Sequence, residues 1–270
     1  MGDPVEEASR NDQPNAEHGG RPEVTVGRLT IDDERRRTPK TSERVALEIV
    51  HDIVAKGLRT GARLPLEAAM VSQYSVSRAS LREALRLLEV QGLIRLRPGP
   101  GGGPVVGAVE PSHLARTVSL YFHLGAATYG QLLATQVLLE PLCAETAARH
   151  PDRRKVLEPF THREPYENDE AAYRRATTEF HGAVYQLAAN PVLTLVTQAV
   201  THMVTHHVVA TMDPVELWPS ILDEHVELAR VIGAGSSDRA RRLMSAHFKA
   251  QHDFYRERWP ARMYELIEWR

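Results

Sequence analysis

Three histidines in the C-terminal half of the chain, His181, His225 and His247, could together bind a divalent metal ion. Each lies on a different predicted helix, and each helix could turn its histidine toward the interior of a helical bundle. Three neutral imidazoles are a typical ligand set for zinc and similar ions, and they leave a coordination position open. A single histidine is more often a hydrogen-bonded core or surface residue. Both interpretations stay open on the spacing alone.

A second group of polar residues stands at the start of a predicted helix in the N-terminal third: Ser77, Arg78, Ser80 and Arg82. They lie opposite a stripe of leucine and alanine that would be buried. This pattern suits a recognition helix, whose first turn enters the DNA major groove and whose arginines can pair with guanine. An ordinary solvated helix surface is the alternative.

The charge distribution favours DNA binding. Residues 38–107 contain ten Lys and Arg against six Asp and Glu, a net charge of +4, whereas the whole chain has a net charge of −2. A basic segment in a nearly neutral chain is typical of a nucleic-acid-binding module joined to another domain. Arg63 and Arg97, which flank the helix in sequence, are further candidate DNA contacts.

The composition excludes several protein classes. The chain has 270 residues, of which 42% are hydrophobic and 25% charged, and this is typical of a globular protein with room for two domains. Its one cysteine, Cys143, excludes an internal disulfide and is expected in the core. No apolar run approaches the roughly 20 residues needed to cross a bilayer, so no membrane partner is expected. The polar, acidic N-terminus is unlike a signal peptide, and a cytoplasmic location is expected.

The order of elements predicts a mainly α fold. Residues 1–37 have few apolar side chains and are expected to form a disordered tail. Three helices and a hairpin around a Gly/Pro turn predict a winged helix-turn-helix domain over 38–107. Helices at 112–124, 128–149, 169–188, 192–210, 214–232 and 236–257 predict an all-helical bundle over 111–259, whose interior suits a ligand pocket.

Three short motifs, LPLE at 64–67, VSRASLREAL at 76–85 and QGLI at 91–94, resemble the GntR family of bacterial transcription regulators in order and spacing. The resemblance implies that Ser77, Arg78, Ser80 and Arg82 contact operator DNA and that Gly99, in the wing, approaches the minor groove. The sequence departs from the family pattern at two places. Leu66 replaces a serine, and Ala68 replaces an arginine that often touches DNA, which suggests a different operator preference or weaker binding.

The helical half resembles the FCD effector domain of the FadR subfamily, through Leu139-Glu140-Pro141 and through helices that bear Phe-His and Glu-His. The resemblance implies a zinc, nickel or manganese ion on His181, His225 and His247. Two candidate effector contacts depart from the pattern. Thr177 replaces a metal-binding aspartate, and Gln136 replaces an arginine that could pair with an acidic effector, so a neutral or more apolar effector is expected.

These observations favour a ligand-responsive transcription regulator, with repression as the expected action. It would bind double-stranded operator DNA as a homodimer and a small-molecule effector in its helical domain. One alternative is a metal-dependent hydrolase that uses the three histidines, with Glu179 or Glu224 as general base. Another is an architectural DNA binder with an inert dimerisation domain. His202 and His206, four residues apart, are possible substitute metal ligands or a polar pocket lining.

Overall fold

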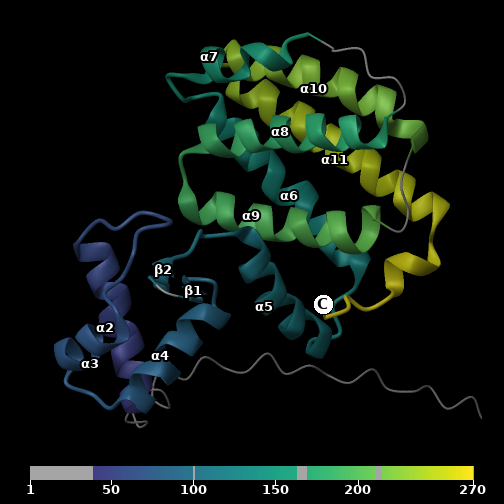
Figure 1. Cartoon of the computed structure of the whole chain (residues 1–270). Helices are drawn as coiled ribbons and strands as arrows, with labels where there is room; N and C mark the ends of the chain where they lie inside the picture. The colour runs from purple at the N-terminus through teal and green to yellow at the C-terminus, as the bar shows by residue number, and fades with distance from the viewer. Residues whose placement is uncertain (1–38, 100, 163–168, 211–214, 270) are drawn as a thin grey trace, which may run out of the picture.

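The computed structural model describes residues 39–99, 101–162, 169–210 and 215–269. The predicted tail, residues 1–37, lies outside the described residues. Figure 1 shows a small N-terminal unit beside a larger helical unit, with helix α5 next to both. The predicted fold class, mainly α with a winged helix-turn-helix and a helical bundle, is confirmed. Within the described residues, no helix is long and apolar enough to cross a membrane.

The N-terminal unit has three helices and a two-stranded antiparallel hairpin. Its recognition helix α4 begins after Ser77, whose side chain caps it, and ends before Gly92, which has a φ of +74°. Leucine and alanine every three or four residues give α4 a buried face that packs on α2. The elements are α2 (Thr41–Ala55), α3 (Glu67–Tyr74), α4 (Arg78–Val90), β1 (Ile94–Arg97) and β2 (Gly103–Val106).

The helical unit is organised around α6, which packs against α11, α8 and α9 and runs through the middle of the bundle (Figure 1). The buried side chains of α6 recur every three or four residues from Tyr129 to Ala147 and include Cys143, which is fully buried as expected, whereas Gln131 and Leu138 are exposed. The elements are α5 (Pro111–Leu124), α6 (Tyr129–Ala147), α7 (Arg153–Leu157), α8 (Glu170–Ala188), α9 (Pro191–Met203), α10 (Trp218–Gly233) and α11 (Ser237–Arg258).

Three details differ from the predicted elements. The helix expected over 192–210 is α-helical only to Met203 and continues as a π-helix, Val204–Val209. Helix α7 and a 3-10 helix at Ala261–Tyr264 were not predicted, because each is too short to show a hydrophobic period. Thr41 and Ser42, whose residue types suit a helix cap, are instead the first two residues of α2, and Lys40 occupies the N-cap position.

The two units meet where α4 and the hairpin contact the start of α5. The guanidinium of Arg116 donates a 2.9 Å hydrogen bond to the carbonyl oxygen of Val90, at the end of α4. The His113 ring lies so close to Gly92 that a Cβ on the glycine would be 2.1 Å from it. Because Gly92 has no side chain, the N-terminal turn of α5 can lie directly on the turn that follows the recognition helix.

We expect Gly92→Ala to destabilise the protein more than Gly57→Ala. Both glycines have positive φ, but a Cβ on Gly57 would meet nothing within 4 Å, whereas one on Gly92 would clash with His113. The backbone strain alone should cost about 1–2 kcal/mol in each variant, and displacing the His113 ring from its rotamer should add roughly another 0.5–1.5 kcal/mol at Gly92. Urea unfolding followed by circular dichroism measures both. Equal losses would show that the contact with His113 contributes nothing to stability.

Candidate functional site

The first candidate site is the start of α4, where the predicted DNA contacts lie together. The Oγ of Ser77 accepts a 3.1 Å hydrogen bond from the backbone N–H of Ser80, and the two hydroxyl oxygens are 3.0 Å apart. Ser77 and Arg78 are exposed, while Ser80 is half-buried. Ser77 thus caps the first turn of α4. Its exposed hydroxyl also lies at the helix N-terminus, where the helix dipole favours a DNA phosphate.

Arg82 lies one turn further along α4 and connects it to α3. Its Nε donates a 3.0 Å hydrogen bond to the Glu67 carboxylate, yet 69% of the Arg82 side chain is exposed. An exposed ion pair of this kind contributes little to stability. The ion pair can instead hold the Arg82 guanidinium in an extended position, and a DNA phosphate or base would compete with Glu67 for this guanidinium.

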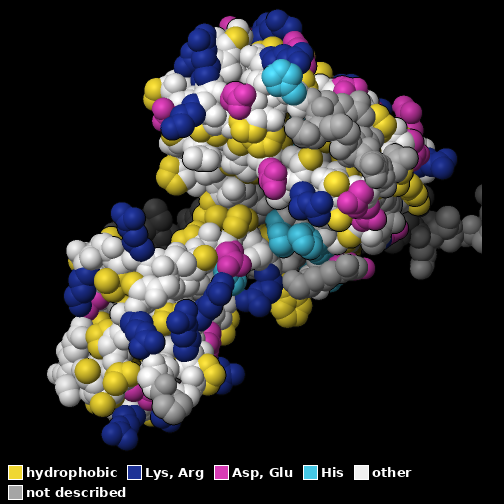
Figure 2. Space-filling view, turned by 45° about the horizontal axis from the view of Figure 1, so that its top comes forward, with side chains coloured by type: hydrophobic (Ala, Val, Ile, Leu, Met, Phe, Trp, Pro, Cys, Tyr) yellow, Lys and Arg dark blue, Asp and Glu magenta, His cyan; other side chains and the backbone are white. Residues whose placement is uncertain are grey.

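The wing contributes the remaining predicted DNA contacts. Arg63 and Arg97, both exposed, line a cleft of about 290 Å³ together with the glycines of the hairpin turn. Leu66 lies in the same cleft, so the hairpin and α4 flank the start of α3 on its two sides. Gly99 is exposed with a φ of +92°. Figure 2 shows several Lys and Arg side chains on this unit.

The second candidate site is the cluster of His181, His225 and His247, from α8, α10 and α11. All three are buried, and each offers one ligand atom within 4.8 Å of the others. Tetrahedral zinc with Zn–N distances of 2.0–2.1 Å needs nitrogens about 3.4 Å apart. The Nε2 atoms of His225 and His247 are 3.4 Å apart, so this pair already has the spacing that the ion requires. The donor set therefore fits a divalent ion.

Burial favours the uncharged form of His181 and His225. Burial, with a smaller contribution from the neighbouring His247, lowers the pKa of His181 to about 3. Burial, with His181 and His247 nearby, also holds the pKa of His225 well below its ordinary value. The His225 ring is stacked on Phe180, with ring centroids 4.3 Å apart. Neutral imidazoles with free lone pairs are the form that binds metal.

A buried carboxyl group lies behind the cluster. Glu140, on α6, is fully buried, and burial raises its pKa to about 7 although hydrogen bonds from Tyr185 and Thr201 oppose the shift. Its Oε2 is 3.7 Å from the Nδ1 of His181. The sequence analysis did not single out Tyr185 or Thr201. The position of Tyr185, four residues after His181 on the same helix, was the available signal.

A cavity of about 340 Å³ opens beside the histidines. It brings together both predicted effector contacts, Gln136 and Thr177, with His181 and His247. The amide of Gln136 donates a 3.1 Å hydrogen bond to Thr201, whereas the buried Oγ1 of Thr177 has no hydrogen-bond partner among the described residues. The other polar residues that line the cavity are Tyr173, Arg174, Thr178, Thr201, Thr205, His206, Gln251 and Tyr255.

His202 and His206 do not join the cluster of three. Their rings stack on each other, with centroids 3.9 Å apart, and the Nδ1 of His206 is 2.8 Å from the carbonyl oxygen of His202. His206 lines the cavity at the π-helix, which is consistent with a polar lining rather than a ligand. A π-helix beside a cavity often marks a functional position, because the extra residue redirects side chains.

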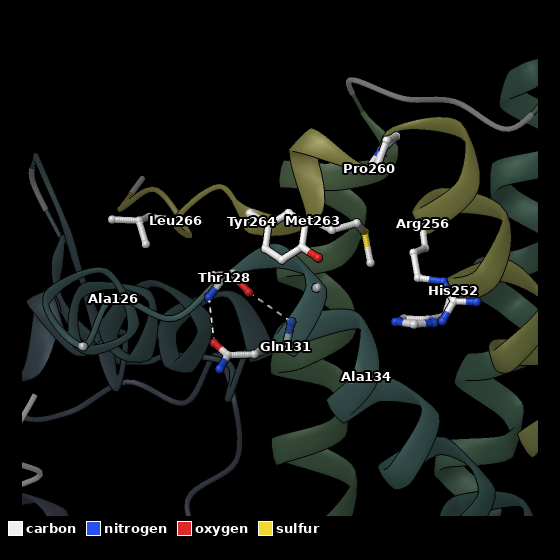
Figure 3. Close-up of a pocket in the computed structure, with 12 residues that line it drawn as sticks. Ala126, Thr128, Gln131, Ala134, His252, Arg256, Pro260, Met263, Tyr264 and Leu266 are labelled. Carbon is white, nitrogen blue, oxygen red and sulfur yellow. Dashed lines mark hydrogen bonds between the residues drawn. The ribbon is translucent and has the colours of Figure 1, made fainter. Parts of the chain in front are cut away.

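A larger groove of about 780 Å³ lies at the N-terminus of α6. Figure 3 shows its lining, which includes His252, Arg256, Met263 and Tyr264, and the reciprocal hydrogen bonds between Thr128 and Gln131. These two bonds already satisfy the first turn of the helix. None of the predicted effector contacts lines this groove.

Comparisons with known proteins identify a matching domain in each half of the chain. Residues 41–102 match the family "Bacterial regulatory proteins, gntR family", and residues 131–250 match the FCD domain. The "HTH-type transcriptional repressor NanR" of Edwardsiella tarda is 24% identical over 231 residues, which cover 80% of this chain and 86% of NanR. The "HTH-type transcriptional regulator LutR" of Bacillus subtilis is 23% identical over 73% of this chain and 92% of LutR.

A solved structure shows the same fold. "Streptococcus agalactiae GntR" aligns with a TM-score of 0.56 and 19% identity, over 78% of this chain and 99% of that one. A winged helix-turn-helix joined to a helical effector domain defines a DNA-binding transcription regulator. The chain belongs to the GntR family and carries an FCD domain, as FadR-type regulators do.

Ser77 can be tested in its two roles separately. We expect Ser77→Ala to lower the free energy of unfolding by about 1 kcal/mol, because the first turn of α4 loses its cap. Ser77→Asp should keep the stability, since aspartate caps equally well, but should weaken DNA binding by placing a negative charge against phosphate. Urea unfolding and fluorescence anisotropy on duplex DNA measure the two effects. Full DNA affinity in Ser77→Asp would show that this helix end does not face the DNA.

Proposed function

We propose that this transcription regulator senses a small molecule in the cavity beside His181, His225 and His247, within a domain spanning 111–259. A winged helix-turn-helix domain spanning 38–107 would carry the response to operator DNA. The observation that carries this proposal is the convergence of three buried histidines from three helices beside one small cavity, which His181 and His247 line. Repression is the proposed action, since the similar NanR proteins are named repressors.

The DNA-binding role rests on the exposed start of α4 and on the wing. A recognition helix reads one half-site, so a homodimer is proposed to read two half-sites related by two-fold symmetry. The proposed base or phosphate contacts are Ser77, Arg78, Ser80 and Arg82 on α4, and Arg63, Arg97 and Gly99 around the wing.

The three histidines are proposed to hold a zinc, nickel or manganese ion. When bound, such an ion supplies a positively charged position for an oxygen donor of the effector. Gln136 and Thr177 line the cavity next to this position and are proposed to hydrogen-bond the effector. Since neither is charged, they favour a neutral recognition group at this end of the cavity.

A chain of packed elements connects the cavity with the DNA-binding face. The π-helix after α9 lines the cavity, α9 packs against α5, and α5 contacts the end of α4 through Arg116 and His113. An effector that binds one arrangement of α9 better than another would change the orientation of α4 through α5.

No observation favours the hydrolase alternative. Of its two candidate bases, Glu224 is hydrogen-bonded to His247, and Glu179 is exposed and does not line the cavity. The domains and relatives indicate a transcription regulator.

We expect Arg82→Ala to abolish sequence-specific DNA binding. A random duplex library enriched with the wild-type protein should yield a consensus site, whereas the variant should enrich none, because one arginine–guanine pair contributes about 1–3 kcal/mol of discrimination. Arg44→Ala on α2 is a matched control, since Arg44 is also exposed and ion-paired, with Glu48. Recovery of the same consensus by Arg82→Ala would contradict the assignment of the recognition helix.

We expect the protein, purified without chelator or nickel resin, to contain about one divalent ion per chain. His225→Ala should remove it, because two histidines seldom hold such an ion tightly. His206→Ala should retain it, since His206 lines the cavity but lies outside the cluster. Elemental analysis of the wild type and the two variants measures the metal content per chain. A metal-free wild type that also takes up no added zinc would overturn the metal site.

A further inference from the structure

A carboxylate on α10 hydrogen-bonds one of the histidines from outside the cluster. Glu224 directly precedes His225, yet its Oε2 reaches across to α11 and lies 2.5 Å from the Nδ1 of His247. His247 is almost fully buried, with 1% of its side chain exposed, whereas 43% of Glu224 is exposed. One helix therefore supplies both a member of the cluster and the partner of the neighbouring member.

This hydrogen bond fixes which nitrogen of His247 faces the cluster. With its Nδ1–H donated to Glu224, the neutral ring carries its lone pair on Nε2. The amide of Gln251 lies 2.9 Å from this Nε2, and the Nε2 of His225 lies 3.4 Å from it. His247 is thus held with its acceptor atom directed at the place where the three rings meet.

A second carboxyl group has a similar position behind His181. The Oε2 of Glu140 and the Nδ1 of His181 are 3.7 Å apart, and both atoms are buried without a hydrogen-bond partner among the described residues. A shift of under 1 Å would join them in a hydrogen bond. Two of the three histidines therefore have a carboxyl group on the side away from the cluster.

The two carboxyl groups lie where a bound divalent ion would need negative charge nearby. Three neutral imidazoles bring no negative charge, and the lining residue one turn before His181, Thr177, is uncharged. A divalent ion in such a buried place would be costly without nearby negative charge. Carboxylates that accept a proton from a metal-bound histidine orient the ring and increase its basicity.

Building on the metal site proposed above, we propose that Glu224 is a positioning residue for metal binding and that Glu140 has the same role behind His181. Glu224 fixes the orientation and tautomer of His247 and supplies, from outside the ligand set, negative charge that the ligands lack, while Glu140 lies where it can hydrogen-bond His181. Neither contacts the ion itself.

The test compares zinc affinities of full-length variants by competition with a chromophoric chelator, with His225→Ala as the blank. We expect Glu224→Ala to weaken zinc binding by about 10–100-fold. Glu224→Gln should lose less, because its amide oxygen still accepts the hydrogen bond although the charge is gone. Glu140→Gln should also weaken binding. Glu179→Gln is the matched control, since Glu179 is an exposed glutamate two residues before His181 and should bind as the wild type does.

A second readout separates positioning from folding. In the metal-free protein, ¹⁵N spectra of the imidazoles should show His247 protonated on Nδ1, and Glu224→Ala should give a mixture of tautomers with an unchanged circular dichroism spectrum. Wild-type zinc affinity and an unchanged tautomer in Glu224→Ala would overturn the role of Glu224 while leaving the metal site in place. A wild type that binds zinc no better than His225→Ala would overturn the metal site, and this inference with it.

Discussion

The burial of uncharged imidazoles beside a carboxyl group is the constraint on which the helical unit depends. Buried polar atoms without partners cost about 1–3 kcal/mol each, and three lie here: the Oε2 of Glu140 and the Nδ1 atoms of His181 and His225. The apolar contacts among α6, α8, α10 and α11 must offset that cost. A group that satisfied these atoms would stabilise the folded chain by mass action.

Helix α6 serves both the packing of the bundle and the binding site. Gln136 and Glu140, one turn apart, reach the cavity and the histidine cluster, while Cys143 and Ala147 belong to the apolar core. The buried face of α6 carries the polar Gln136 and Glu140, whereas the apolar Leu138 on another face is 70% exposed, so apolar residues alone do not mark the buried face. The sequence therefore predicts that the helix exists, but its pattern does not show which face turns toward the cavity.

The sequence predicted local features well and long-range ones only in outline. The first and last residues of α4 follow from local signals. Ser77 caps the helix at its start, and Gly92, with its positive φ, ends it. The convergence of His181, His225 and His247 depends on how three helices rotate and cross, which no spacing along the chain specifies. The π-helix was also beyond prediction, because Val204–Val209 contains no glycine or proline that would mark a change in the helix before it.

The point at which α5 contacts α4 determines how a change in the cavity could reach DNA. Arg116 and His113 meet the C-terminal end of α4, whereas the proposed contacts with DNA begin at Ser77, before its first turn. At 1.5 Å per residue, the 13 residues of α4 span about 20 Å, so a tilt of about 5° at Val90 would move the other end by nearly 2 Å. Hydrogen bonds to base edges tolerate only a few tenths of an ångström. A small adjustment of α5 is therefore sufficient to break the match with an operator, without any rearrangement inside the DNA-binding unit.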